Sequence, residues 1–221
     1  MKDSIKVGIL DDHLTIINGY KFNFQSREEI EVVWEAEYYS QVEPLLDQHP
    51  TDVIIMDVSV DNAPNDHHEF PILNAILSLI KKFPELNILV ISMHNRHALV
   101  NHIIRAGAKG YILKEDRESH NELPNIIHLI AQGGTFISPS VRTEQEPEDQ
   151  SSPKLTPRML EALSISAAAP SKTTEEIAVQ MDIAPSTVRN LLSHSYARLS
   201  VPNISSAIAK AKMLGLITPD K

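Results

Sequence analysis

The sequence contains no cysteine, so no disulfide can stabilise the fold, a composition that suits the cytosol. It has no apolar run of about 18 residues, the length that a membrane-spanning helix needs. The first residues also lack the apolar core and the cleavage site of a secretory signal. We therefore expect a cytoplasmic protein that has no membrane partner.

Positive charge is scarce as well, and the formal net charge of -9 is unevenly distributed. Residues 1–150 carry 12 Lys/Arg and 24 Asp/Glu, whereas residues 151–221 carry 8 and 5. Only the second part has a composition that could contact a polyanion such as nucleic acid, and its positive excess is small. A chain of 221 residues is long enough for one large or two modest domains.

Short apolar strands alternate with longer amphipathic segments over residues 1–137. The expected strands are 5–10, 30–36, 53–57, 87–92 and 110–113, and the expected helices are 14–26, 40–48, 71–83, 95–106 and 122–132. This alternation predicts an α/β domain with a parallel sheet that is covered by helices on both faces.

Polar residues follow four of the expected strands at the point where each strand ends. They are the pair Asp11-Asp12, then Asp57, Ser92 and Lys114. The carboxyl ends of parallel strands share one edge of the sheet, where ligands bind. Three carboxylates, a hydroxyl and a lysine at this edge predict a site for Mg²⁺ and a phosphoryl group.

The C-terminal part has a different organisation. Residues 138–153 are polar, acidic and rich in proline and serine, and we expect them to be a linker. Residues 154–221 contain four helix candidates and no strand. Thr156 and Thr173 are expected N-caps, Thr173 forming a capping box with Glu176, and Pro185 is expected at the first position of the third helix.

The third helix of this part has one mostly apolar face and one polar face. A short helix, a tight turn and this second helix indicate either a helix-turn-helix or an ordinary helical bundle with a solvated polar side.

The chain resembles a known family, the NarL/FixJ-type response regulators of bacterial two-component systems. The strings VGILDDH (7–13), DVIIMD (52–57), ILVISMH (88–94) and RAGAKGYILK (105–114) resemble a receiver domain. The strings LTPR (155–158) and IAPSTVRNLLSHSYARLSV (183–201) resemble the LuxR-type helix-turn-helix. The resemblance implies a receiver domain over 1–137 with strand order 2-1-3-4-5, a linker over 138–153, and a DNA-binding domain over 154–221.

The resemblance also implies roles for the receiver residues. Asp57 would accept the phosphoryl group, Lys114 would neutralise its oxygens, and Ser92 would donate its hydroxyl to it. Tyr111 would be an aromatic switch that turns inward after phosphorylation. Mg²⁺ would be held by Asp12, Asp11, Asp57 and the backbone carbonyl of Ser59.

For the C-terminal domain, the resemblance implies that the helix starting at Pro185 enters the major groove of promoter DNA. The residues expected to contact DNA are Thr187, Arg189, Asn190, Ser193, His194 and Arg198. The implied partners are a sensor histidine kinase, promoter DNA and a second copy of the chain, since a homodimer is expected on activation. The protein is expected to be a regulator and not an enzyme.

Other functions are less consistent with the sequence. A phosphatase of the haloacid dehalogenase type usually has a second acid two residues after its nucleophile, where this chain has Ser59. A zinc site is disfavoured because His94 and His97 are accompanied by neither cysteine nor an HExxH motif. A signalling adaptor whose C-terminal bundle binds protein, and a constitutive DNA-binding dimer that needs no phosphorylation, stay open as alternatives.

The sequence also departs from the family pattern. The loop 58–70 is longer than usual and lacks an early methionine-proline pair and a glycine. Ala184 replaces the usual serine cap of the recognition helix, and Ser193 stands where lysine is frequent. These departures affect the loop that contains Ser59 and the helix that is expected to contact DNA.

Overall fold

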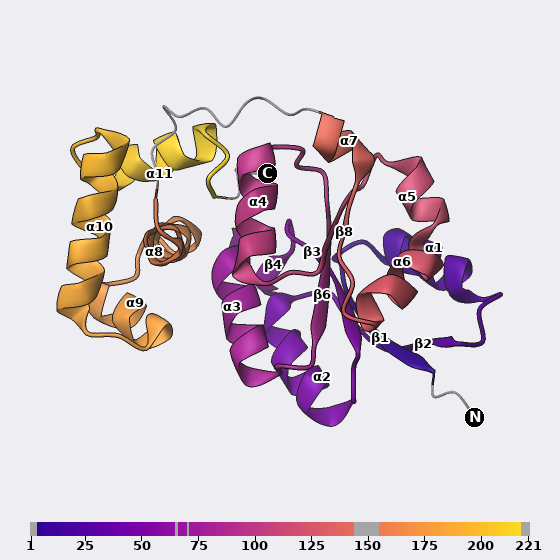
Figure 1. The fold of residues 1–221 in the computed structure, drawn as a ribbon. Helices are drawn as coiled ribbons and strands as arrows, with labels where there is room; N and C mark the ends of the chain where they lie inside the picture. The colour runs from indigo at the N-terminus through magenta and orange to yellow at the C-terminus, as the bar shows by residue number, and fades with distance from the viewer. Residues whose placement is uncertain (1–3, 65, 70, 144–154, 218–221) are drawn as a thin grey trace.

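The computed structural model describes residues 4–64, 66–69, 71–143 and 155–217 (Figure 1). A six-stranded parallel sheet with the order β2-β1-β3-β6-β7-β8 forms the centre of the N-terminal part. Its strands are β1 (Ile5–Leu10), β2 (Ile30–Ala36), β3 (Val53–Asp57), β6 (Asn87–Ser92), β7 (Gly110–Leu113) and β8 (Phe136–Ile137). The five expected strands and their 2-1-3-4-5 order are confirmed, and β8 adds a short strand at one edge.

Helices cover both faces of this sheet, as expected. The elements are α1 (Leu14–Phe24), η1 (Tyr39–Gln41), α2 (Val42–Gln48), α3 (Ile72–Lys82), α4 (His97–Ala106), α5 (Arg117–Asn121), α6 (Leu123–Ala131) and α7 (Pro139–Thr143). Helices α1 and α6 bury apolar side chains against one face, and α2, α3 and α4 do so against the other. Because β3 is buried along its whole length, its sequence is continuously apolar up to Asp57.

Two segments differ from the sequence-based expectation. The loop after Asp57 contains an antiparallel hairpin of β4 (Asp61–Ala63) and β5 (Asp66–Glu69), although its residues are mostly polar. Val58 and Val60 are fully buried before it, which anchors the start of the hairpin. The segment 138–153 was expected to be a linker, but its first residues form α7, because Val141 is fully buried and Ser138 accepts a hydrogen bond from the Leu113 amide. The rest of the expected linker, 144–153, lies outside the described residues.

The C-terminal part is helical and consists of α8 (Pro157–Ala168), α9 (Thr174–Met181), α10 (Pro185–Leu199) and α11 (Ile204–Met213). The side chains of Thr156 and Thr173 cap α8 and α9, and the capping box with Glu176 is present. Pro185 occupies the first turn of α10, as expected.

Helix α8 packs beside α3 of the N-terminal part, and buried apolar residues of the two parts form one continuous cluster (Figure 1). Polar contacts join α3 to α8 and to the end of α9. The Asn74 amide donates to the Glu161 carboxylate at 2.9 Å, and the Gln180 amide donates to the Asn74 oxygen at 3.2 Å. Lys81 and Asp182 form an exposed ion pair at 3.4 Å. No helix among the described residues has the length and apolarity that crossing a membrane requires.

Candidate functional site

The strand register brings the predicted site residues together at one edge of the sheet. Leu10 of β1 pairs with Met56 of β3, so the residues that follow them, Asp11 and Asp57, are neighbours. Asp57 pairs with Ile91 of β6, which places Ser92 on its other side. Ser92 in turn pairs with Leu113 of β7, and Lys114 comes next along the chain. Four adjacent strands therefore carry one site.

The Lys114 ammonium lies between two buried carboxylates. Its Nζ is 2.7 Å from Asp57 Oδ2 and 3.0 Å from Asp11 Oδ2. The side chains of Asp57 and Asp11 are only 3% and 2% exposed, whereas that of Lys114 is 14% exposed. Since one nitrogen contacts both carboxylates, their oxygens cannot be further apart than these two distances together.

Backbone amides hold the other oxygen of each carboxylate. Asp57 Oδ1 accepts a hydrogen bond from the Ser59 amide at 3.1 Å, and Asp11 Oδ1 accepts one from the His13 amide at 2.9 Å. These bonds fix the rotamers of both acids towards the pocket. The structure therefore brings Ser59 to the site through its amide.

Burial and charge act in opposite directions on these groups. Burial raises the pKa of Asp11 above its ordinary value, more than the His13 amide and the Lys114 ammonium lower it. Burial alone would lower the pKa of Lys114, but the hydrogen bonds and charges of Asp57 and Asp11 outweigh it, and the pKa is raised. Lys114 is therefore a stable cation at the centre of the site.

Asp12 completes an acidic cluster at the end of β1. Asp11, Asp12 and His13 each offer one ligand atom, and these atoms lie within 4.8 Å of one another. His13 Nδ1 is 2.6 Å from Asp12 Oδ1, a contact that the sequence-based analysis missed. Carboxylate oxygens from Asp11, Asp12 and Asp57 match the hard oxygen ligands that Mg²⁺ prefers. His94 and His97 do not belong to any such group among the residues whose side chains are described.

Ser92 and Tyr111 lie on β6 and β7, the two strands that follow β3 in the sheet. Ser92 is fully buried, and its hydroxyl oxygen accepts a hydrogen bond from the His94 amide at 3.2 Å. The Tyr111 ring was expected to turn inward after phosphorylation, but it is already fully buried in this structure, and its hydroxyl donates to the His94 carbonyl. Burial raises the pKa of Tyr111 to about 12, so the phenol remains a proton donor at neutral pH. Both residues thus contact the same short loop between β6 and α4.

All six residues expected to contact DNA are exposed along α10, namely Thr187, Arg189, Asn190, Ser193, His194 and Arg198. The opposite side of α10 is anchored by Val188, Ser195 and Leu199, which are buried against the other helices. In Figure 1, α10 lies on the far side of the C-terminal part from the sheet. Arg189 is paired with Glu175 of α9 at 3.4 Å, a contact that the sequence pattern did not indicate.

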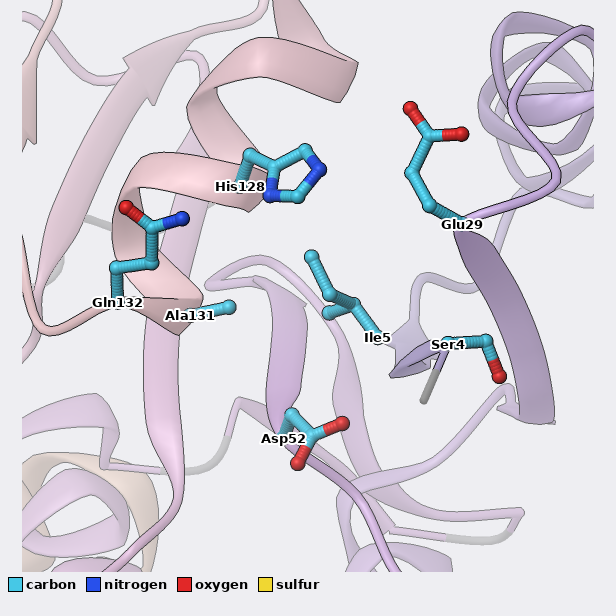
Figure 2. A pocket seen from close by; sticks show the side chains of 7 residues that line it. All are labelled: Ser4, Ile5, Glu29, Asp52, His128, Ala131 and Gln132. Atoms are coloured by element: carbon cyan, nitrogen blue, oxygen red, sulfur yellow. The ribbon is translucent and has the colours of Figure 1, made fainter. Parts of the chain in front are cut away.

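A separate pocket of about 280 Å³ lies at the other end of the strands, near the starts of β1, β2 and β3 (Figure 2). It is lined by Ser4, Ile5, Glu29, Asp52, His128, Ala131 and Gln132. These residues come from the beginning of β1, from the turns before β2 and β3, and from α6 and the residue after it. None of the predicted site residues lines this pocket.

The chain is similar to two known sequence families. Residues 7–127 match the family described as response regulator receiver domain. Residues 153–211 match the family described as bacterial regulatory proteins, luxR family. The two matches are consecutive and together extend over most of the chain.

Similar curated proteins are bacterial regulators. The transcriptional regulatory protein DegU of Brevibacillus brevis is 31% identical over 63% of this chain, and the alignment spans 56% of DegU. An uncharacterised transcriptional regulatory protein of Bacillus subtilis, YhcZ, is 29% identical, with 92% of this chain and 93% of YhcZ covered. Among solved structures, RcsB of Salmonella enterica serovar Typhimurium bound to a promoter has a TM-score of 0.64 at 22% identity. That match covers 94% of this chain and 98% of RcsB and supports the fold.

Proposed function

The chain belongs to the response regulators, with a receiver domain followed by a luxR-type regulatory domain, and on this premise we propose that phosphorylation of Asp57 controls its binding to promoter DNA. One observation carries this proposal: the Lys114 ammonium contacts both Asp57 and Asp11 at the carboxyl edge of the sheet. A sensor histidine kinase is the proposed phosphodonor, and the cytoplasm, where promoter DNA is found, is the proposed place of action.

The chemistry needs little from the protein beyond position and charge. An oxygen of the Asp57 carboxylate attacks phosphorus, and the phosphorus–nitrogen bond of a kinase phosphohistidine breaks, leaving its electron pair on the imidazole. Charge develops on the equatorial phosphoryl oxygens in such a transfer, and the Lys114 ammonium lies 2.7 Å from Asp57, where it can neutralise that charge. No group is required as a strong base, because the nucleophile is already a carboxylate.

Mg²⁺ is the proposed cofactor, held by Asp11, Asp12, Asp57 and the backbone carbonyl of Ser59. It would supply further positive charge to the phosphoryl oxygens and relieve the repulsion between the clustered acids. The burial that raises the pKa of Asp11 is consistent with this role, because a buried carboxylate gains most from a nearby cation.

The proposed DNA interface is the exposed side of α10. Arg189 and Asn190 lie near the N-terminal end of this helix, where side chains reach base edges in helix-turn-helix complexes. Arg198, near its C-terminal end, is suited to a phosphate contact. Because the C-terminal part has few positive charges, one domain alone should bind weakly, and a homodimer on paired half-sites is the proposed active form.

A titration of promoter DNA tests this function. We expect the full-length protein to bind more tightly with Mg²⁺ and beryllofluoride than without them, and affinity to fall steeply with salt as counterions are released. Asp57→Asn serves as the control that should not respond. Light scattering on the same samples should show a shift from monomer to dimer.

Two outcomes would point to other functions. The absence of salt-dependent DNA binding in both states would favour an adaptor whose helical bundle binds protein. Equally tight binding and an unchanged dimer in both states would favour a constitutive regulator that does not use Asp57.

A further inference from the structure

The loop between β6 and α4 contacts both the phosphorylation site and the C-terminal part. It begins at Ser92, whose hydroxyl is buried beside the Asp57 strand, and ends at Arg96 immediately before α4. Within it, the His94 amide donates to Ser92 Oγ at 3.2 Å, and the His94 carbonyl accepts from the Tyr111 hydroxyl. The backbone of this loop is therefore held at its start by Ser92, the group proposed to turn to the phosphoryl group, and by Tyr111, which is already buried.

At the other end of the loop, Arg96 contacts the C-terminal part. Its Nη1 donates a hydrogen bond to the carbonyl of Met213, the last residue of α11. The final carbonyls of a helix lack intrahelical partners and carry partial negative charge, so a guanidinium stabilises this end. Across the structure, these two residues are far apart in sequence but lie in contact between the two domains.

Close packing accompanies this hydrogen bond. Gly215 has φ +66°, and a Cβ at this position would lie 2.9 Å from the Arg96 Cβ and 2.5 Å from its Cδ. The absence of a side chain at Gly215 is therefore what lets the stem of Arg96 lie against the end of α11. A residue with a side chain would be strained there and would also push Arg96 away.

We propose that Arg96 is the positioning residue that couples the state of Asp57 to the docking of the C-terminal domain. The inference rests on the proposed phosphorylation of Asp57, and it adds the receiver residue whose contact with the C-terminal domain changes in response. When the Ser92 hydroxyl turns to a phosphoryl oxygen on Asp57, it leaves the His94 amide, and the loop moves. Arg96 moves with the loop and releases the Met213 carbonyl, which frees α11.

The other polar contacts that the described residues make between the domains do not involve this loop. The Asn74–Glu161 and Lys81–Asp182 contacts come from α3 and not from the loop that follows Ser92. They hold the domains together without sensing Asp57. The outer face of α10 is already exposed while the domains are docked. Release therefore does not uncover this face, but it allows the helix to take other positions relative to the receiver.

A distance measurement tests the coupling, and the absence of native cysteines makes labelling straightforward. Cysteines introduced at the exposed positions Glu85 and Ala197 would carry a donor and an acceptor fluorophore on the full-length chain. Excess unlabelled protein would suppress energy transfer between chains. Transfer would be measured with and without Mg²⁺ and beryllofluoride in the parent protein and in Arg96→Ala, Arg96→Lys and Lys81→Ala.

In the parent protein, beryllofluoride should lower the transfer as the domains separate. Arg96→Ala should start with lower transfer, and beryllofluoride should shift its docking equilibrium by about fivefold less than that of the parent. Arg96→Lys keeps a cationic donor and should recover most of the response. Lys81→Ala removes another exposed cation that joins the two domains, and it should keep the full response to beryllofluoride.

Equal responses of the parent protein and Arg96→Ala would overturn the coupling role while leaving the proposed function intact. A parent protein that does not respond, together with unchanged DNA binding, would overturn both. Arg96 is exposed at the end of a loop, so its substitution should leave the fold intact, and circular dichroism of each variant would verify this.

Discussion

Replacing Lys114 with alanine should destabilise the receiver domain more than any substitution of a surface lysine. The variant leaves the Asp57 and Asp11 carboxylates, 3% and 2% exposed, without the ammonium that lies 2.7 and 3.0 Å from them. Removing one partner of a buried ion pair costs about 3–5 kcal/mol. We expect the lower end, about 3 kcal/mol, because the Lys114 side chain is 14% exposed and water can enter the space it leaves.

Lys82 provides a matched control, because it also lies between two carboxylates. Its ammonium is 3.3 Å from Glu43 and 2.9 Å from Asp47, but these acids are 41% and 54% exposed. Solvent screens such pairs, so Lys82→Ala should cause a much smaller loss. Each variant removes a lysine that contacts two carboxylates at similar distances, and the two sites differ in how deeply those carboxylates are buried.

Urea denaturation followed by circular dichroism, in the presence of a chelator, would give both free energies of unfolding. Added salt should reduce the Lys82 effect further and change the Lys114 effect little, since buried pairs are poorly screened. Mg²⁺ should recover part of the stability of Lys114→Ala by binding the buried Asp57 and Asp11 carboxylates, which the variant leaves without a cation. Equal losses in the two variants would refute the argument that a buried, charge-balanced site has formed.

Three further predictions concern other elements. Burial raises the pKa of Asp116, but the hydrogen bonds from Ser119, Ser138 and Ser140 together outweigh it and lower the pKa. The stabilisation by Asp116 is therefore present above pH 3.8 and is lost as pH falls through the folded pKa, so Asp116→Ala should cost about 1 kcal/mol at pH 7 and little at low pH in urea titrations. Thr173→Ala removes the N-cap of α9 and should lower the free energy of unfolding by about 1 kcal/mol, whereas an unchanged value would contradict the capping role. Arg189→Ala should weaken DNA binding and reduce the slope of log affinity against log salt concentration by about 1. Glu175→Ala should strengthen DNA binding, because it frees Arg189 from its ion pair. Tighter binding by Arg189→Ala together with weaker binding by Glu175→Ala would exclude α10 as the interface.

The arrangement of the receiver could be predicted because its sequence and its topology agree. Strand β3 is buried on both faces, so its apolar run ends abruptly at Asp57, and this boundary is visible in the sequence. The parallel register then places Asp11, Ser92 and Lys114 beside it without any further information. The helix ends at Thr156 and Thr173 were predictable because capping depends on residues three positions apart.

Features that depend on tertiary partners could not be predicted in this way. Strands β4 and β5 pair with each other, and their polar residues show no alternation from which a hairpin could be inferred. Helix α7 forms because Val141 finds a buried position next to the receiver.

The docking of the two domains could not be predicted from the sequence either. Glu161 is 3% exposed, and a buried glutamate on an amphipathic helix has no signature in the sequence. It is buried because Asn74 of the receiver and Arg158 of its own helix satisfy its carboxylate at 2.9 Å each. Likewise, nothing in the sequence near Arg96 indicates that its partner is a carbonyl at the end of α11.

The formation of an acyl phosphate on Asp57 is the most direct test of the account. Full-length protein would be incubated with a small-molecule phosphodonor, with Mg²⁺ or with chelator, and analysed by intact mass and by peptide mapping. We predict one phosphoryl group per chain, on Asp57, only with Mg²⁺, and labile to hydroxylamine as an acyl phosphate should be. Equal phosphorylation of Asp57→Asn, or phosphorylation that is indifferent to Mg²⁺, would contradict it.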